Sequence, residues 1–237
     1  MINIINQVLI NNNYKIIEVE SSLTNYFINL FQSHPHAYKD EFFITLQSKT
    51  QSDSDALDIL TEKAEILYEE ILNSGIVPPT FKKNSTLIIC QEYSKIERTT
   101  IYSLEEDPFN FKKNVITYTE EELNSLNSYL FERSIVDLTN ETISKIINAK
   151  DGLDFLSFKE NQENKKDYYS LILKIILKLP FITYIPKEKQ LDDLELEIQN
   201  SLSISHHKIY KKLLDSSTEW NDENILENIN LIWGETE

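Results

Sequence analysis

The chain has 237 residues and a formal net charge of −16, from 23 basic and 39 acidic side chains. A field of that sign repels phosphate, so direct binding to nucleic acid is not expected, and a basic partner protein fits the charge better. Hydrophobic residues make up 41% of the chain, which excludes a disordered polypeptide and predicts a folded protein with a substantial core.

Cysteine and glycine are both rare. The single cysteine, Cys90, lies in an apolar run, which indicates an inert buried thiol in a reducing compartment and excludes an intrachain disulfide. Three glycines are too few for a glycine-rich phosphate loop, so most nucleotide-binding enzymes are excluded and no cofactor is expected.

No segment predicts export or membrane insertion. The N-terminus lacks a basic region followed by an apolar core, and we therefore expect a cytoplasmic protein. The most apolar window, Tyr168 to Pro186, is interrupted by lysines and a proline, and its helical part is too short to cross a bilayer. It predicts a core helix.

The front of the chain predicts an alternation of strands and helices. Residues 1–10 are apolar but interrupted by asparagines, and their state is left open. Tyr14 to Glu20 and Glu41 to Ser48 have the composition of strands. Between them, Ser21-Ser22 can cap a helix that runs to about Ser33, because four apolar residues recur at helical spacing: Leu23, Phe27, Leu30 and Phe31. A clear amphipathic helix follows, with Leu57, Leu60, Ala64, Leu67 and Ile71 on one face.

The stretch from Thr86 to Tyr118 is predicted to organise the fold. Leu87 to Cys90 is a continuous apolar run, typical of a central strand buried on both faces. Arg98 to Ser103 and Val115 to Tyr118 are rich in β-branched and aromatic residues and predict two more strands. Leu104 to Lys113 should form the loop between them, because Pro108 disfavours helix there.

Strand patterns nearly vanish after residue 120. Thr119 and Glu122 form a capping box that predicts the start of a helix. Five further helices are predicted, beginning at Asn140, Asp167, Leu191, His206 and Asn221. We therefore predict an α+β protein with an N-terminal mixed β-sheet with flanking helices (residues 14–118), followed by a helical C-terminal half. The regions are 1–120, an α/β-like sheet region, and 121–237, a helical region packed on it.

No catalytic constellation emerges from the sequence. A metal-dependent nuclease needs an acid on one strand and Glu-x-Lys on the next; Asp40 or Glu41 lacks the second acid near Lys49, and Glu18-Val19-Glu20 lacks the lysine. The four histidines have no cysteine pair or clustered acids at ligand spacing, and no serine lies in a Gly-x-Ser-x-Gly elbow. We expect no metal site and no enzymatic activity.

The loop after Leu104 carries three acids, two aromatics and two lysines. Two interpretations stay open. The loop is either an acidic turn with Phe109 and Phe111 tucked into the core, or a docking loop whose aromatic anchors are ringed by charge.

One resemblance rests on this region. Leu87 to Cys90, followed by Ile101-Tyr102-Ser103-Leu104-Glu105-Glu106-Asp107, then Phe109, Lys112-Lys113 and Val115-Ile116, resembles the middle components of bacterial three-component ABC-ATPase systems, including Lamassu-type antiphage defence. The pattern is an apolar strand, a Tyr-x-(Ile/Leu)-Glu-x-Asp-x-Phe segment and a basic pair before the next strand, with Lys112 where the pattern favours arginine.

The resemblance implies a non-enzymatic adaptor that binds an SMC-like ABC ATPase and an effector, commonly a nuclease. The residues expected to contact a partner are Tyr102, Glu105, Asp107, Phe109, Phe111, Lys112 and Lys113. The alternative is an acidic immunity or inhibitor protein that binds a basic nuclease toxin or mimics DNA, because surface carboxylates would steer it onto such a target.

Overall fold

A five-stranded mixed sheet forms the centre of the fold in the computed structural model, which describes residues 1–34, 40–160, 166–183, 198, 200–214 and 220–233. The strands lie side by side in chain order: β1 (Tyr14–Ile17), β2 (Tyr26–Ser33), β3 (Phe42–Ser48), β4 (Ser85–Glu92) and β5 (Lys112–Tyr118). β1, β2 and β3 pair antiparallel, whereas β3, β4 and β5 pair parallel. The predicted mixed sheet in the N-terminal half is confirmed.

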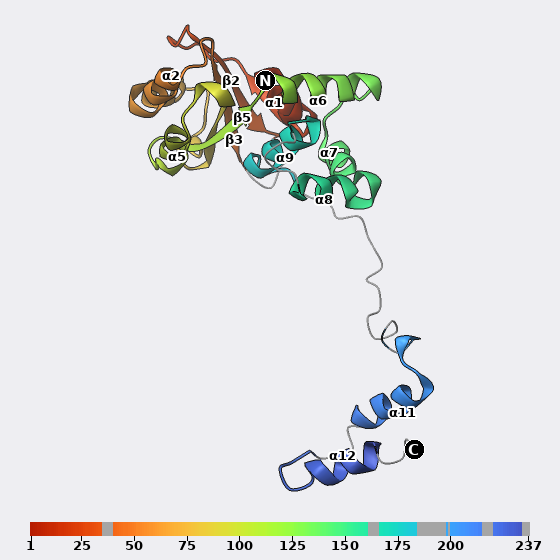
Figure 1. Cartoon of the computed structure of the whole chain (residues 1–237). Helices are drawn as coiled ribbons and strands as arrows, with labels where there is room; N and C mark the ends of the chain where they lie inside the picture. Colours follow the sequence, from red (N-terminus) through yellow and green to blue (C-terminus); the bar gives the residue numbers. More distant parts are fainter. Residues whose placement is uncertain (35–39, 161–165, 184–197, 199, 215–219, 234–237) are drawn as a thin grey trace. The chain divides into compact units, whose positions relative to one another are not determined.

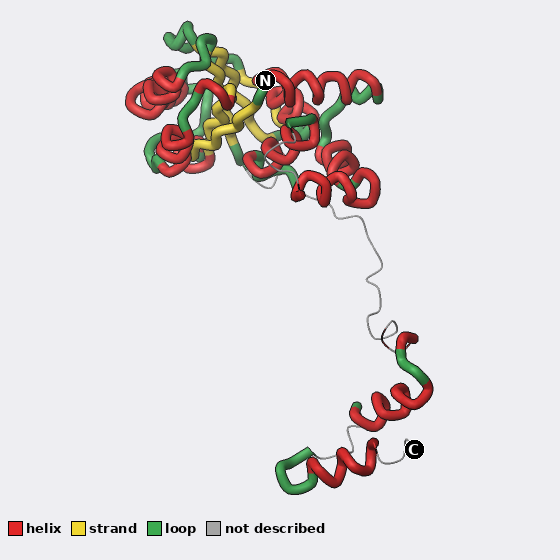
Figure 2. Tube along the Cα trace, in the orientation of Figure 1, coloured by secondary structure: helices red, strands yellow, loops and turns green. Residues whose placement is uncertain are grey.

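Helices cover both faces of this sheet (Figures 1 and 2). One face packs against α1 (Ile2–Asn11), α6 (Glu120–Glu132), α7 (Asn140–Ile147) and α9 (Tyr168–Lys178). The other face packs against α2 (Asp53–Asp58), the π-helical turn η1 (Ile59–Lys63), α3 (Ala64–Asn73), α4 (Phe81–Asn84) and α5 (Arg98–Glu106). Smaller elements complete the unit: the 3₁₀ turns η2 (Tyr93–Lys95) and η3 (Ala149–Gly152) and the helix α8 (Leu153–Glu160).

The side chains of β4 divide between these two cores. Ile88 and Cys90 point to the α1/α6/α9 side, and Leu87 and Ile89 point to the α2/α3/α5 side; all four are fully buried. This confirms the strand predicted from the apolar run. Its predicted central position is confirmed as well, because β4 is an internal strand that lies between β3 and the edge strand β5.

The strand predicted at Arg98 to Ser103 is wrong, because these residues belong to α5. β4 and β5 are parallel, so the chain must return from the end of β4 to the start of β5 over one face of the sheet. A helix is the usual form of such a crossover connection. Thr100 and Leu104, four residues apart, are the buried positions of this helix. The predicted loop after it shrinks to residues 107–111, because Leu104 still belongs to α5 and Lys112 already starts β5.

The helix predicted from Ser21 to Ser33 is also wrong, because most of it is β2. Leu30 and Phe31 are both fully buried, but they face opposite cores. A strand covered on both faces can bury adjacent residues, here Leu30 and Phe31. Together with the apolar Phe27 they give the spacing i, i+3, i+4, which is also the spacing of one face of a helix. Phe27 is in fact half exposed.

Several helices begin where their caps predict. Ser52 caps α2 and Thr119 caps α6, each in a capping box with the acid three residues later, and Thr139 caps α7. α9 is the predicted core helix, with Asp167 as its N-cap. The N-terminal apolar segment, left open by the sequence, forms α1 and buries five side chains against the sheet.

The chain divides into two compact units, residues 1–187 and 188–237. In the second unit, α11 (Ile204–Leu213) and α12 (Ile225–Trp233) correspond to two of the predicted C-terminal helices. Most of the predicted helix at 191–202 lies outside the described residues. The last described strand ends at Tyr118; a domain division near residue 120 stays a prediction.

No helix in the described ranges combines the length and apolar character that crossing a bilayer requires.

The middle strand supplies a stability test. Leu46 in β3 is fully buried, whereas Leu177 on α9 is 80% exposed. We expect Leu46→Ala to lower the free energy of unfolding by about 2–5 kcal/mol, since it leaves a cavity between sheet and helices. Leu177→Ala should stay within about 0.5 kcal/mol of wild type in the same chemical denaturation. Equal effects of the two substitutions would contradict the sheet register.

Candidate functional site

The seven residues predicted to contact a partner lie in one stretch that runs from α5 through a short loop into β5. α5 carries Tyr102 and Glu105, the loop carries Asp107, Phe109 and Phe111, and β5 begins with Lys112 and Lys113. The stretch therefore lies at one edge of the sheet, because β5 is an edge strand. The seven side chains differ widely in exposure.

The two aromatic residues of the loop differ completely in exposure. Phe109 is 71% exposed, whereas Phe111 is buried on the α2/α3/α5 side of the sheet. The ring of Phe111 meets the ring of Tyr68 edge to face, with centroids 5.1 Å apart, and lies 6.2 Å from the ring of Phe81. Of the two interpretations of this loop, core packing holds for Phe111, and Phe109 is left on the surface.

Lys113 is a buried cation that fixes the loop. Its side chain is fully buried, and its ammonium forms an ion pair with Asp107. The same nitrogen donates hydrogen bonds to the carbonyl oxygens of Phe109, at 2.6 Å, and Phe111, at 3.4 Å. A buried charge must be paired and hydrogen-bonded to be tolerated, and Lys113 meets both conditions inside its own loop.

Glu105 is likewise engaged within the fold. Its carboxylate accepts a hydrogen bond from the backbone N–H of Val115, at 2.9 Å, and forms an ion pair with Lys178 of α9. The carbonyl of Lys178 in turn accepts a hydrogen bond from the side chain of Asn114, at 2.7 Å. Glu105 thus ties α5, β5 and α9 together.

Three of the seven residues present their side chains to solvent: Tyr102, Phe109 and Lys112. Arg98 lies against Tyr102, and its Nε donates a hydrogen bond to the Tyr102 hydroxyl at 2.6 Å. Partner contact by this stretch stays a prediction, and these three residues with Arg98 form its accessible part, which we call the edge patch.

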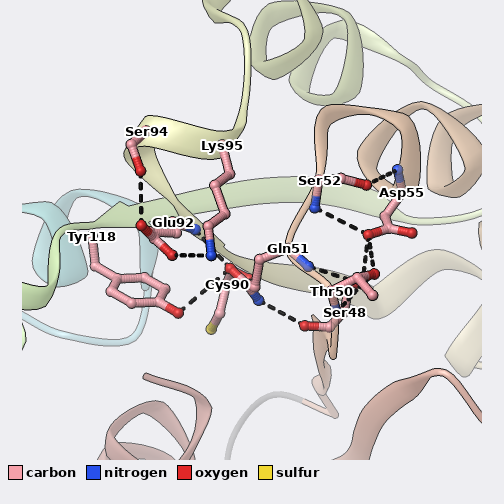
Figure 3. Close-up of polar contacts among 10 residues, drawn as sticks. All are labelled: Ser48, Thr50, Gln51, Ser52, Asp55, Cys90, Glu92, Ser94, Lys95 and Tyr118. Atoms are coloured by element: carbon pink, nitrogen blue, oxygen red, sulfur yellow. Dashed lines mark hydrogen bonds and ion pairs between the residues drawn. The ribbon is translucent and has the colours of Figure 1, made fainter.

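A second polar cluster occupies the carboxyl ends of the parallel strands (Figure 3). Gln51, in the loop after β3, is buried and has a positive φ of 56°. Its amide nitrogen donates to the carbonyl of Ser48, at 2.8 Å, and more weakly to that of Cys90, at 3.4 Å. Its amide oxygen accepts from the backbone N–H of Glu92, at 2.7 Å, and from the Tyr118 hydroxyl, at 3.4 Å. One side chain thereby joins the ends of β3, β4 and β5.

The neighbouring carboxylate, Asp55, closes the loop between β3 and α2. It accepts hydrogen bonds from the hydroxyls of Thr50 and Ser48, the latter at 2.9 Å, and from the backbone N–H of Ser52 at 3.0 Å. Partial burial raises the pKa of Asp55, but the hydrogen bonds from Thr50, Ser52 and Ser48 outweigh it and lower the pKa to about 2. Asp55 is therefore an ionised structural acceptor at neutral pH.

The groups in this cluster are poorly suited to reaction chemistry. Cys90 is fully buried, and burial raises the pKa of its thiol to about 12, so the nucleophilic thiolate is suppressed. Glu92 is held by Lys95 at 2.8 Å and by the hydroxyl of Ser94 at 2.7 Å. Across the described ranges, no three His, Cys, Asp or Glu side chains gather in a way that could hold a metal ion.

An open apolar hollow of about 390 Å³ lies between α6 and α7. It is lined by Tyr129, Ile135, Val136 and Ile146 together with Asp137, Thr142 and Lys145. One of the lining side chains, Val136, is 79% exposed. The hollow suits a hydrophobic side chain of a binding partner better than a polar small molecule.

A mixed sheet covered by helices on both faces hosts many unrelated functions, so the fold defines only the general class, an α+β protein. Residues 41–146 match the family model described as "ABC-three component (ABC-3C) system Middle Component 1". The match covers less than half of the chain and extends from β3 almost to the end of α7. It links this region to a component of a multi-protein system. No curated protein and no solved structure matches the chain.

The sequence did not single out Gln51 or the ion pairs of Glu105 and Lys113. The partners that Gln51 reaches on β4 and β5, and those of Glu105, lie 10 to 73 residues away along the chain, whereas Lys113 pairs with Asp107, six residues away, inside its own loop. The capping motif at Ser52 and Asp55 is also local, because its two residues are three positions apart.

The two phenylalanines of the loop provide a matched pair. Phe111→Ala should lower the free energy of unfolding by about 3–5 kcal/mol, because a fully buried ring is removed. Phe109→Ala should change it by no more than about 0.5 kcal/mol, because that ring lies in solvent. Urea denaturation followed by circular dichroism measures both; a large loss for Phe109→Ala would show that its ring is part of the core.

The hydrogen bonds of Asp55 should contribute to the free energy of unfolding in a way that depends on pH. Its pKa in the folded protein, about 2, lies below the value of about 3.9 expected when unfolded, so its stabilisation is complete above about pH 5 and is lost as pH falls toward 2. We expect the wild type to lose about 1 kcal/mol more than Asp55→Asn over this range, after allowance for solvent screening.

Asp58→Asn, at an exposed position of α2, is the matched control for this pH series and should keep the wild-type pH dependence. If Asp55→Asn and wild type lose stability in parallel between pH 5 and pH 2, the hydrogen bonds assigned to Asp55 do not act as described.

Proposed function

We propose that the protein is the middle component of a bacterial three-component ABC-ATPase system and acts as a non-enzymatic adaptor. The observation that carries this proposal is the family match over residues 41–146. The matched region includes the parallel half of the sheet, the edge patch and the hollow between α6 and α7. The part of the chain related to that family therefore contains two of the surfaces available for binding.

The disposition of polar groups supports an adaptor over an enzyme. Three ion pairs join buried or partly buried acids and lysines: Lys113 with Asp107, Lys174 with Glu122, and Lys178 with Glu105. Catalytic groups must instead reach a substrate from a cleft with some freedom to exchange protons. Here the charges fix a loop and tie α9 to α6 and α5, which suits a scaffold for other proteins.

The partners proposed for this adaptor are an SMC-like ABC ATPase and an effector nuclease, in a Lamassu-type antiphage system of the cytoplasm. The adaptor restrains or positions the effector until foreign DNA is sensed. The net charge of −16 favours protein partners over direct contact with that DNA, since the field of the chain repels phosphate. The edge patch, with Phe109 at its centre, is the proposed contact for one of them.

A second candidate function is an acidic inhibitor or immunity protein. The observation that favours it is the same excess of carboxylates, which would steer the chain onto a basic nuclease or mimic the charge of DNA. The two candidates differ in the number and kind of proteins that they bind.

Co-expression of the tagged chain with the products of its neighbouring genes tests the proposal. We expect an ATPase and an effector to co-purify in a fixed ratio. Tyr102→Ala with Phe109→Ala should weaken retention of one component about tenfold, because both side chains are exposed and neither is core. Phe131→Ala, which removes an exposed ring outside the edge patch, is the control and should leave retention of that component unchanged.

Retention of one small basic protein and no ATPase would favour the inhibitor. Turnover of any nucleic acid by the isolated chain with Mg²⁺ or Mn²⁺ would overturn the non-enzymatic role.

A further inference from the structure

The C-terminal unit exposes an unusual amount of apolar side chain for its size. Among its described residues only one large apolar side chain, Ile232, is buried. Nine others are at least 38% exposed: Ile198, Leu213, Leu214, Trp220, Ile225, Leu226, Ile229, Leu231 and Trp233. Chains of about 50 residues bury little surface on their own, so a unit of this composition gains most of its stability by covering that surface with another protein.

Most of the apolar residues of α12 lie on one continuous face, and Leu231 lies off it. At 100° per residue, Ile225, Ile229 and Ile232 lie within about 60° of one another, and Leu226 and Trp233 extend the same face. Ile232 is the member that is buried, and α11 contacts α12. Leu226, 73% exposed, and Ile225, 43% exposed, are left open on this face, while Glu227 lies on the opposite side of the helix.

The charge of the chain indicates what can cover this face. Residues 188–237 contain twelve acidic and four basic side chains, a net charge of −8, and residues 1–187 contain 27 acidic and 19 basic ones, also −8. The four basic side chains of the C-terminal unit all precede α12, and residues 213–237 contain none. A second copy of the chain, or its own N-terminal unit, would therefore bring like charges together.

We infer that the apolar face of α12 docks into a hydrophobic groove of a partner protein whose rim carries lysine and arginine. An amphipathic helix laid into a groove is a common mode of association, in which the apolar face supplies affinity; the net acidic charge of this unit would speed its encounter with a basic rim. This inference names one interface of the proposed adaptor and, as an assignment within a three-component system, rests on that proposed function. It differs from the edge patch, which lies in the other unit.

The two tryptophans of the chain, Trp220 and Trp233, both lie in the C-terminal unit, so intrinsic fluorescence reports on this unit alone. Full-length protein carrying Trp220→Phe leaves Trp233, on the apolar face, as the reporter. A synthetic amphipathic helical peptide made of leucine and lysine is the first probe. We expect it to shift the Trp233 emission to shorter wavelength and to bind more weakly when salt is raised from about 0.1 M to about 0.5 M.

Ile225→Ser with Leu226→Ser should weaken this binding at least about tenfold. Leu231→Ser is the matched control, because Leu231 is 58% exposed on the same helix but points away from the face; it should change binding less than about twofold. Equal weakening by both variants, or equal binding of a leucine–glutamate peptide, overturns the inference. A concentration-dependent emission shift with a doubled mass in sedimentation, without any peptide, also overturns it, because a second copy then covers the face.

The same variants in the co-expression experiment separate the inference from the proposed function. Loss of one component with Ile225→Ser and Leu226→Ser, but not with Leu231→Ser, supports both. Full retention of the components by both variants overturns the inference and leaves the adaptor role intact. If wild type retains no component, the adaptor role fails and the peptide titration alone decides whether α12 is a docking helix for basic, apolar partners.

Discussion

Parallel pairing of β3, β4 and β5 is the constraint on which the rest of the N-terminal unit depends. Parallel strands cannot be joined by tight turns, so each connection must return over a face of the sheet to the start of the next strand. Here α2–α3 and α5 form these crossover connections, both on the same face. The opposite face of these buried strands must then be covered by other parts of the chain. α1, from the start of the chain, and α6, α7 and α9, from beyond the sheet, supply that cover.

The same constraint explains how much of the fold was predictable. Strands with long apolar runs, such as Leu87 to Cys90, and helices with local caps, such as Thr119 with Glu122, were found because their determinants lie within a few residues. Arg98 to Ser103 was assigned the wrong type because its β-branched residues favour a strand, whereas the crossover between parallel strands requires a helix. The prediction of a helix where β2 lies was wrong for a related reason: Leu30 and Phe31 are adjacent and both apolar because they face two different cores.

The candidate contact residues show a similar limit. Their clustering in space followed from their closeness in sequence, but their exposure did not. Phe111 fills a core formed with Tyr68, and Glu105 is bound to Lys178 of a helix far along the chain. A charged residue in an acidic chain is easily taken for a surface group. Here, however, Glu105 and Glu122 form ion pairs with lysines far along the chain. Gln51 escaped notice because its four hydrogen-bond partners come from three strand ends that only the folded sheet brings together.

The buried ammonium of Lys113 has a consequence for any contact that Phe109 makes. Because this nitrogen holds the carbonyl oxygens of Phe109 and Phe111, the backbone under the exposed ring is ordered before a partner arrives. Preorganised loops lose little conformational entropy on association, so a small area can give useful affinity. On contact with a partner, the ring of Phe109 would lose its own rotational freedom while the backbone that carries it stays as it is.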